Sequence, residues 1–163
     1  DRSTASLFGD GAGAAVVGPA EVDGIGRVVW ASDGDQHGSL TIHGSPRRLA
    51  MNGRAIYRWA TTSLPDLARR ACAQVGIEPA ELAAFVPHQA NLRITESVVK
   101  ALRLPDSVVI ARDVVDSGNT SAASVPLALT RLHEQGEVRT GDQVLLLGFG
   151  AGLTAAGQVV RCP

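Results

Sequence analysis

The most constraining feature of the sequence is an alternation between short apolar runs and longer segments with helical periodicity. The runs at 83–87, 107–111 and within 141–162 are rich in valine and other apolar residues, as buried strands are. The segments between them place apolar residues at intervals of three and four, which is typical of amphipathic helices. Strands that alternate with helices predict an α/β fold with a mixed, mainly parallel sheet covered by helices.

The first third of the chain is also predicted to hold strands. Residues 13–18 and 25–31 are short, rich in valine and flanked by glycine or proline, so both are expected to be buried strands. Residues 32–50 are polar and rich in turn-forming residues, with one short strand expected at 40–43.

Three helical regions are expected. The first lies between Asn52 and Gly76 and contains Pro65, which predicts either two helices or one kinked helix. Asn91 is expected to cap the second helix, because a side-chain amide oxygen can accept from the free N–H groups of the first turn. The third helix follows a polar loop and ends at Gly136.

Composition limits the class of protein. The chain has 163 residues, of which 45% are hydrophobic and 19% charged, and this is typical of one soluble globular domain. A net charge of −1 gives no overall field for nucleic acid or an anionic membrane, and no apolar run approaches the roughly 18 residues that cross a bilayer. Two cysteines make no disulfide framework, so we expect a reducing, cytoplasmic location. The start lacks methionine and enters an apolar, glycine-rich segment at once, so we expect a fragment of a longer protein.

Polar residues follow three of the predicted strands, where ligands gather in sheets of this kind. His88, Asn119 and Gly150 each come after a different apolar run or lie at its end. An imidazole and a carboxamide can both donate hydrogen bonds without a fixed charge, so together they could stabilise an oxyanion or enolate. The alternative is structural: a histidine after a strand can simply be satisfied in place, and Asn beside Gly is a common turn.

Other motifs carry less functional information. The segments "GDGAG" and "GFGAG" lack the last glycine of the dinucleotide fingerprint, so tight turns are the better interpretation. No metal site is predicted, because the acidic residues and histidines at 33–43 match no ligand spacing. Cys72 lies on the apolar face of a helix and Cys162 at the terminus, so neither is expected to be an activated nucleophile.

Four blocks of sequence together resemble one known family. The segments "LFGDGAGAAVV", "VPHQANLRI", "GNTSAASVPLAL" and "GDQVLLLGFGAG" occur in the order and spacing of β-ketoacyl-acyl carrier protein synthase III, within the thiolase-like superfamily. The match is to the C-terminal half of that enzyme and covers essentially residues 1–163 as one domain. It implies the C-terminal half of a thiolase-like fold, with a mixed, mostly parallel, five-stranded sheet covered by helices.

The resemblance implies two catalytic residues of a Cys-His-Asn triad. His88 in "PHQAN" matches the family's histidine and Asn119 in "GNTS" matches its asparagine. The nucleophilic cysteine of the family lies in the N-terminal half, and neither cysteine of this chain matches its motif. The isolated half is therefore expected to be inactive.

Further residues are assigned only by the resemblance. Ala151 in "GFGAG" matches the loop that supplies a backbone N–H to the oxyanion hole of the acyl-enzyme. Met51, Gly53, Asn91 and Arg93 resemble residues that line the pantetheine channel and the carrier-protein entrance.

The implied reaction joins an acyl-CoA primer to malonyl-acyl carrier protein, with loss of carbon dioxide, to give a 3-oxoacyl product in fatty-acid initiation. Acyl-CoA and acyl carrier protein are then the partners, no cofactor or metal is needed, and the full-length enzyme is expected to be a homodimer. Two alternatives remain open: a related acyl transfer in polyketide or other specialised metabolism, and a non-catalytic module that binds CoA or a carrier protein.

Overall fold

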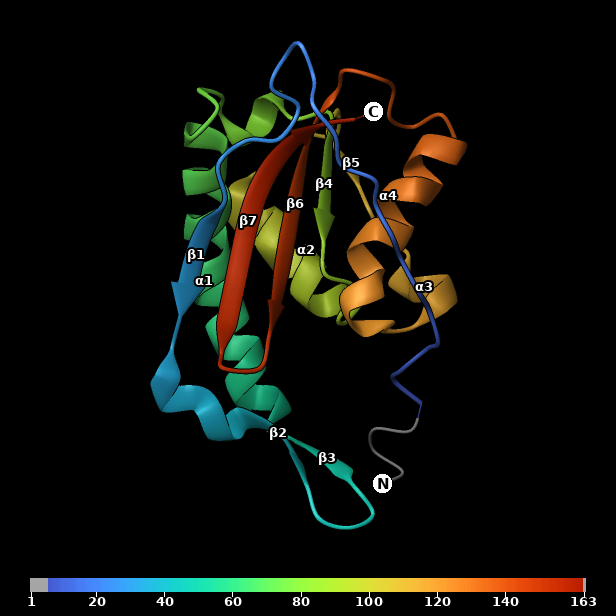
Figure 1. Ribbon diagram of the computed structural model, residues 1–163. Coiled ribbons are helices and arrows are strands. Elements are labelled where there is room, and N and C mark those ends of the chain that lie inside the picture. The colour runs from blue at the N-terminus through green and yellow to red at the C-terminus, as the bar shows by residue number, and fades with distance from the viewer. Residues whose placement is uncertain (1–5, 163) are drawn as a thin grey trace.

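The computed structural model describes residues 6–162. The chain forms three layers, with one sheet between helices on both faces (Figure 1). The strands are β1 (Val29–Ser32), β2 (Leu40–His43), β3 (Arg48–Met51), β4 (Ala84–Pro87), β5 (Val109–Ile110), β6 (Gln143–Gly150) and β7 (Thr154–Arg161). The α-helices are α1 (Gly53–Ala73), α2 (Leu92–Leu102), α3 (Val114–Ser117) and α4 (Ser124–Glu134). Short 3-10 helices cover Gly34–Ser39, Pro79–Glu81 and Ser121–Ala123.

The main sheet has five strands in the order β1-β7-β6-β4-β5. Strand β4 pairs in parallel with β5 and β6, whereas β7 pairs antiparallel with β6 and β1. The expected mixed, five-stranded sheet is therefore present, and its pairs divide equally between the two directions. The parallel share is smaller than we expected because β6 and β7 are joined by a tight turn, which forces antiparallel pairing.

The larger core lies where α1 and α2 pack on one face of the sheet. Leu64 and Leu67 of α1 and Phe85 of β4 are fully buried in it. A single helix runs through Pro65, where the sequence left two helices or one kinked helix open. Asn91 caps α2 as predicted, because its Oδ1 accepts from the backbone N–H of Ile94 at 3.1 Å.

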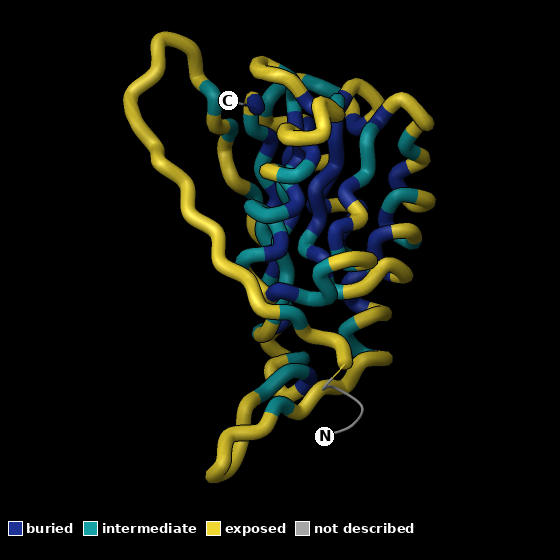
Figure 2. Tube along the Cα trace, turned by 90° about the vertical axis from the view of Figure 1, so that its right-hand side faces the viewer, coloured by how far each residue is buried: buried dark blue, intermediate teal, exposed yellow. Residues whose placement is uncertain are grey.

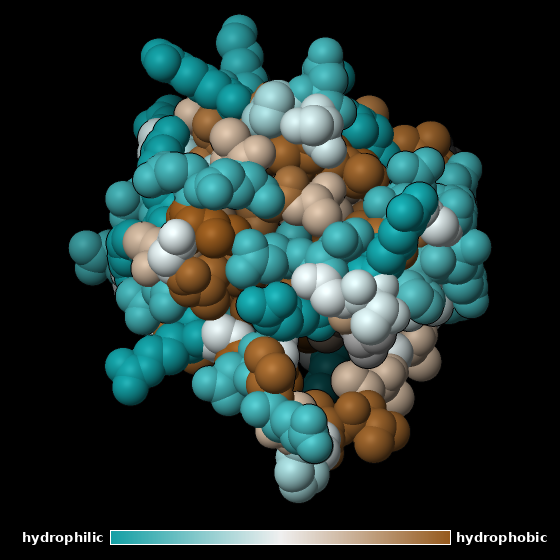
Figure 3. Space-filling view, turned by 90° about the horizontal axis from the view of Figure 1, so that it is seen from above, coloured by the Kyte–Doolittle hydropathy of each residue, from teal (hydrophilic) through white to brown (hydrophobic). Residues whose placement is uncertain are grey.

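The opposite face of the sheet is covered only in part. Helix α4 packs there against β4 and β6, and its Ala128 and Leu132 belong to a second buried cluster with Ala84 and Val144. Trp30 in β1 keeps 62% of its surface exposed, although its neighbour in the strand, Val29, packs against the core on the α1 side. Figure 3, which views the molecule from above, shows apolar side chains at the surface among hydrophilic ones.

The N-terminal segment corrects one prediction. Residues 13–18 form no strand, and Val16 in their centre is fully exposed. The segment runs as an extended stretch outside the packed layers (Figure 2). An apolar run indicates a need for burial, but a strand also needs a neighbour to pair with, and no described strand lies beside this one. The second predicted strand, at 25–31, is present in part as β1, with an isolated bridge between Ile25 and Val160 before it.

Strands β2 and β3 form a separate antiparallel hairpin before α1. Only β2 was predicted, because the partner strand lies in the turn-rich part of the sequence. The hairpin projects beyond the carboxyl ends of β4 and β6, at the lower end of the molecule in Figure 1. Among the described residues, no helix is both long enough and apolar enough to span a bilayer.

Candidate active site

His88 lies directly after β4, where the parallel pairing with β6 continues for one more hydrogen bond. Its backbone N–H donates to the carbonyl of Leu147 at 2.7 Å. This bond fixes the position of the ring beside Phe149, two residues further along β6. The two ring centroids are 5.1 Å apart in an edge-to-face arrangement.

The imidazole of His88 contacts a hydroxyl group through the nitrogen that does not face the cavity. Its Nδ1 lies 2.6 Å from Oγ of Ser124, the first residue of α4. Burial of the ring lowers the pKa of His88 from 6.5 to about 4. Removal from water penalises the charged form, so the imidazole is neutral at neutral pH.

Gln89 is a structural member of the site that the sequence analysis did not single out. Its side chain is fully buried and makes three hydrogen bonds with backbone groups. Nε2 donates to the carbonyls of Pro87 at 2.7 Å and Ala111 at 3.2 Å, and Oε1 accepts from the N–H of Val114 at 3.1 Å. The amide therefore ties the end of β4 to the chain that follows β5. An amide next to the strand-end histidine was the only signal in the sequence.

Asn119 lies in the loop between α3 and the 3-10 helix that precedes α4. Its Oδ1 accepts from the backbone N–H of Ser121 at 2.9 Å, which turns the amide nitrogen toward the cavity. Its backbone pairs with the N-terminal segment: Asn119 donates to the carbonyl of Leu7 at 2.9 Å, and Gly9 donates back at 3.0 Å. A Cβ on Gly9 would lie 1.9 Å from the carbonyl oxygen of Ser117, so only glycine fits there.

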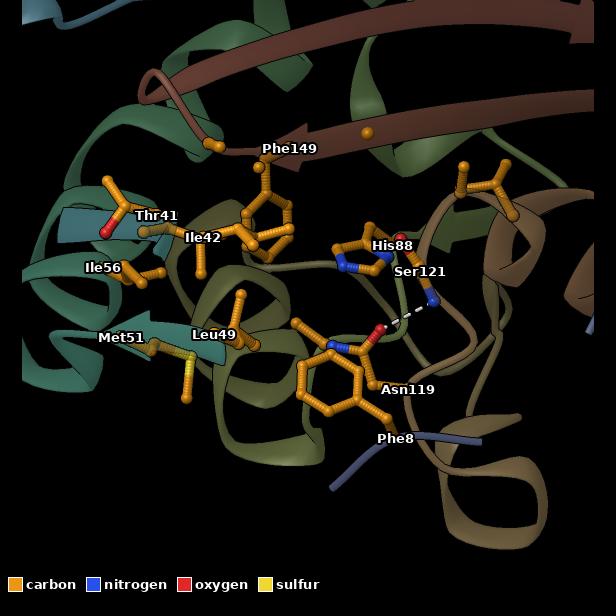
Figure 4. Close-up of a pocket in the computed structure, with 17 residues that line it drawn as sticks. Phe8, Thr41, Ile42, Leu49, Met51, Ile56, His88, Asn119, Ser121 and Phe149 are labelled. Carbon is orange, nitrogen blue, oxygen red and sulfur yellow. Dashed lines mark hydrogen bonds between the residues drawn. The ribbon is translucent and has the colours of Figure 1, made fainter. Parts of the chain in front are cut away.

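His88 and Asn119 open into one cavity of about 790 Å³. Figure 4 shows a ring nitrogen of His88 and the amide nitrogen of Asn119 pointing into it from the same side. The walls come from the β2–β3 hairpin, α1, the end of β6 and the loop around Asn119. The lining is mostly apolar and includes Phe8, Leu40, Ile42, Leu49, Met51, Ile56, Ala90, Ala122, Val125 and Phe149. Two uncharged donors thus face a largely apolar space.

The other predicted site residues divide into two groups. Met51 and Ala151 line the cavity, the first from the hairpin and the second from the β6–β7 turn. Gly53, Asn91 and Arg93 are exposed and lie outside the lining. The side chain of Asn91 caps α2, which is a structural role that needs no substrate.

Neither cysteine is placed to act as a nucleophile. Both are buried, and both lie outside the lining of the cavity. Burial, with a smaller contribution from Glu78, raises the pKa of Cys72 to about 11, and burial also raises the pKa of Cys162. Raised pKa values keep both thiols protonated and unreactive.

Comparison with protein families gives a match over residues 72–162 to the family described as 3-oxoacyl-[acyl-carrier-protein] synthase III C terminal. That range is more than half of the chain. The chain belongs to this family. Residues 1–34 match a second model, 3-oxoacyl-[acyl-carrier-protein] synthase III. The resemblance predicted from the four sequence blocks is thereby confirmed, and so is the thiolase-like fold class.

Relatives of the synthase III family match the chain along its whole length. A β-ketoacyl-[acyl-carrier-protein] synthase III of Streptomyces coelicolor is 57% identical and a mycobacterial one from Mycobacterium marinum is 42% identical, each over 100% of this chain. In both cases the chain spans 52% of the relative, so it covers about half the length of the curated relatives that it matches.

Two solved structures show the same architecture. The priming β-ketosynthase of a polyketide biosynthetic pathway is 48% identical with a TM-score of 0.96, over 100% of this chain and 52% of its own. The 3-oxoacyl-(acyl carrier protein) synthase III of Pseudomonas aeruginosa is 38% identical with a TM-score of 0.87, over 100% of this chain and 53% of its own.

Proposed function

We propose that this synthase III chain is the C-terminal half of a decarboxylating condensing enzyme, an acyltransferase that joins an acyl-CoA primer to malonyl-acyl carrier protein. The observation that carries the proposal is the pair of uncharged donors, His88 and Asn119, in one apolar cavity. Two free, buried thiols fit the expectation of a cytoplasmic protein.

The donors suit the decarboxylation step. When the C–C bond of the malonyl thioester breaks, carbon dioxide leaves and the bonding electron pair delocalises onto the thioester oxygen as an enolate. Nε2–H of His88 and the amide N–H of Asn119 would donate to that oxygen, and an apolar surrounding strengthens both bonds. A neutral imidazole is the form required here, and the low pKa of His88, about 4, supports it.

The enolate needs an acyl thioester to attack, and neither cysteine of this chain is placed to form one. On this proposal the N-terminal half supplies a cysteine whose thiolate attacks the primer thioester, releasing CoA and forming an acyl-enzyme. The enolate carbon then attacks that thioester and the cysteine sulfur leaves. Ala151, in the turn that borders the cavity, would donate its backbone N–H to the tetrahedral oxyanion.

The uncovered part of the sheet supports the proposal that a second half of the protein packs on it. Apolar side chains of the segment at 7–28 and Trp30 of β1 are exposed in this chain, and exposed apolar patches usually mark a surface that binds another protein surface. We assign residues 1–163 to one C-terminal domain that packs against an N-terminal domain carrying the cysteine.

The entrance to the cavity would receive the substrates. Met51 lines the apolar cavity. The exposed residues Gly53, Asn91 and Arg93 lie at the starts of α1 and α2. Arg93 could pair with an acidic carrier protein, and a full-length homodimer is expected by family resemblance.

A polyketide role is the second candidate. The 48% identical structure with a TM-score of 0.96 is a priming β-ketosynthase of a polyketide pathway. The same donors would serve either pathway, so the primer distinguishes them: acetyl-CoA and longer or branched acyl-CoA thioesters should be compared as substrates of the full-length protein.

The catalytic proposal is tested by alanine substitution in the full-length protein. His88→Ala and Asn119→Ala should each abolish release of carbon dioxide from malonyl-acyl carrier protein, while His37→Ala, which removes a histidine outside the cavity lining, should not. Wild-type condensation by either site variant would refute the assignment. It would also favour the remaining alternative, a module that binds CoA or a carrier protein without catalysis.

A further inference from the structure

Ser124 occupies an unusual position behind the candidate site. It is fully buried, it does not line the cavity, and its hydroxyl lies between two groups of the strand-end segment. Oγ is 2.6 Å from Nδ1 of His88 and accepts the backbone N–H of Gln89 at 3.2 Å. Any effect of Ser124 on a substrate must therefore pass through His88.

The hydrogen bonds of the hydroxyl decide which nitrogen of the ring carries the proton. A serine hydroxyl has one proton to donate and two lone pairs. One lone pair is taken by the N–H of Gln89, and among the described residues Nδ1 of His88 is the acceptor within reach for the proton. A buried O–H left without an acceptor is costly, so the hydroxyl donates to Nδ1. In a neutral ring the proton then resides on Nε2.

We propose that Ser124 is a positioning residue that holds His88 as the Nε2–H tautomer. The proton is thereby kept on the nitrogen that faces the cavity. This inference rests on the proposed function, because only an oxyanion or enolate ligand needs a donor at that point. Without the hydroxyl, Nδ1–H and Nε2–H forms would compete, and the Nδ1–H form would present a lone pair to the developing negative charge.

The surroundings keep the hydroxyl in place. Ser124 begins α4, whose next turns are anchored on the sheet by Ala128 and Leu132. Gln89 supplies the N–H and is itself fixed by its three side-chain hydrogen bonds. The segment after β4 and the start of α4 are thus joined by two hydrogen bonds to the same hydroxyl, one from the N–H of Gln89 and one with Nδ1 of His88.

The tautomer can be read directly in the full-length protein labelled with ¹⁵N-histidine. The chemical shifts of the two ring nitrogens distinguish a protonated from an unprotonated atom, and His88→Asn assigns the signals by removing them. We expect protonated Nε2 and unprotonated Nδ1 for His88 at neutral pH. A protonated Nδ1 in the unaltered protein would overturn the proposal without any variant being needed.

Ser124→Ala supplies the second measurement, with Thr130→Ala as the control because Thr130 is an exposed hydroxyl residue on the same helix. We expect Ser124→Ala to give both tautomers and to lower kcat about tenfold, the scale of one hydrogen bond, with KM for malonyl-acyl carrier protein unchanged. A single Nε2–H tautomer in Ser124→Ala overturns the inference.

The tautomer readout needs no turnover, so the two proposals fail separately. If His88→Ala retains condensation, the catalytic role of the ring is wrong. If His88→Ala is inactive while Ser124→Ala keeps one tautomer, only the positioning role is wrong.

Discussion

Lowering the pH should leave His88 neutral long after ordinary histidines have become charged. The ring is buried against Phe149, and among the described residues lining the cavity no other side chain is acidic or basic. No nearby carboxylate therefore compensates the loss of water around a charged ring. Burial alone lowers the pKa of His88 to about 4.

The size of the effect follows from the two protonation equilibria. The unfolded chain has a histidine pKa of 6.5, so it takes up a proton before the folded chain does as the pH falls. Stability associated with neutral His88 is fully present above about pH 6.5 and is lost as the pH falls toward 4. A lowering of this size corresponds to about 3 kcal/mol in the free energy of unfolding.

Histidine ring signals followed by NMR from pH 8 to pH 4 in the full-length protein provide the assay. His88→Asn identifies the signal, and it also serves as the reference for thermal unfolding, because the other three histidines are present in both proteins. We expect the wild type to lose stability relative to His88→Asn as the pH falls below about 6.5. A His88 midpoint near 6.5, or parallel unfolding curves at all pH values, would refute the argument from burial.

Four further outcomes are expected. Gly9→Ala brings a Cβ within 1.9 Å of a backbone carbonyl oxygen, so it should displace the N-terminal segment that pairs with Asn119. We expect a lower kcat with little change in KM; unchanged kinetics would contradict this. Arg131→Met leaves the buried carboxylate of Asp113 without its partner and should cost about 2 kcal/mol in chemical denaturation, part of which Asp113→Asn should restore. Phe85→Ala should cost about 4 kcal/mol, because it empties a fully buried site; a loss under about 1 kcal/mol would show that the core collapses around it. The 163-residue chain alone should self-associate in sedimentation experiments through the exposed apolar groups of 7–28, and a monomer that unfolds cooperatively would argue against a missing partner surface.

Local signals in the sequence were sufficient to predict features whose interactions involve residues close in the sequence. Asn91 caps α2 through the N–H of a residue three positions later, so the cap is visible without knowledge of the fold. Strand β4 is apolar at every position because it is buried on both faces, and a continuous apolar run records that. His88 and Asn119 were predicted to share a site because both follow strands whose carboxyl ends meet at one sheet edge.

Interactions between distant segments were not visible in the same way. The apolar pattern of 13–18 predicted a strand, yet whether a strand forms depends on a pairing partner that no local pattern reveals. Gln89 and Ser124 form a buried hydrogen bond across 35 positions of sequence, and each alone is an ordinary polar residue beside a helix or strand. Their importance follows only from burial, which turns each polar atom into a group that must find a partner.

The parallel pairing of β4 and β6 helps to position His88. One backbone hydrogen bond beyond the strand, from His88 to Leu147, fixes the backbone of His88, and Phe149 contacts its ring edge-to-face. The start of α4 then presents Ser124 to Nδ1, the ring nitrogen that does not face the cavity. On the proposed function, a rigid donor pair and a separate nucleophile make chemical sense. On that proposal the donors would keep one orientation during decarboxylation, whereas the cysteine would change from thiolate to thioester and back.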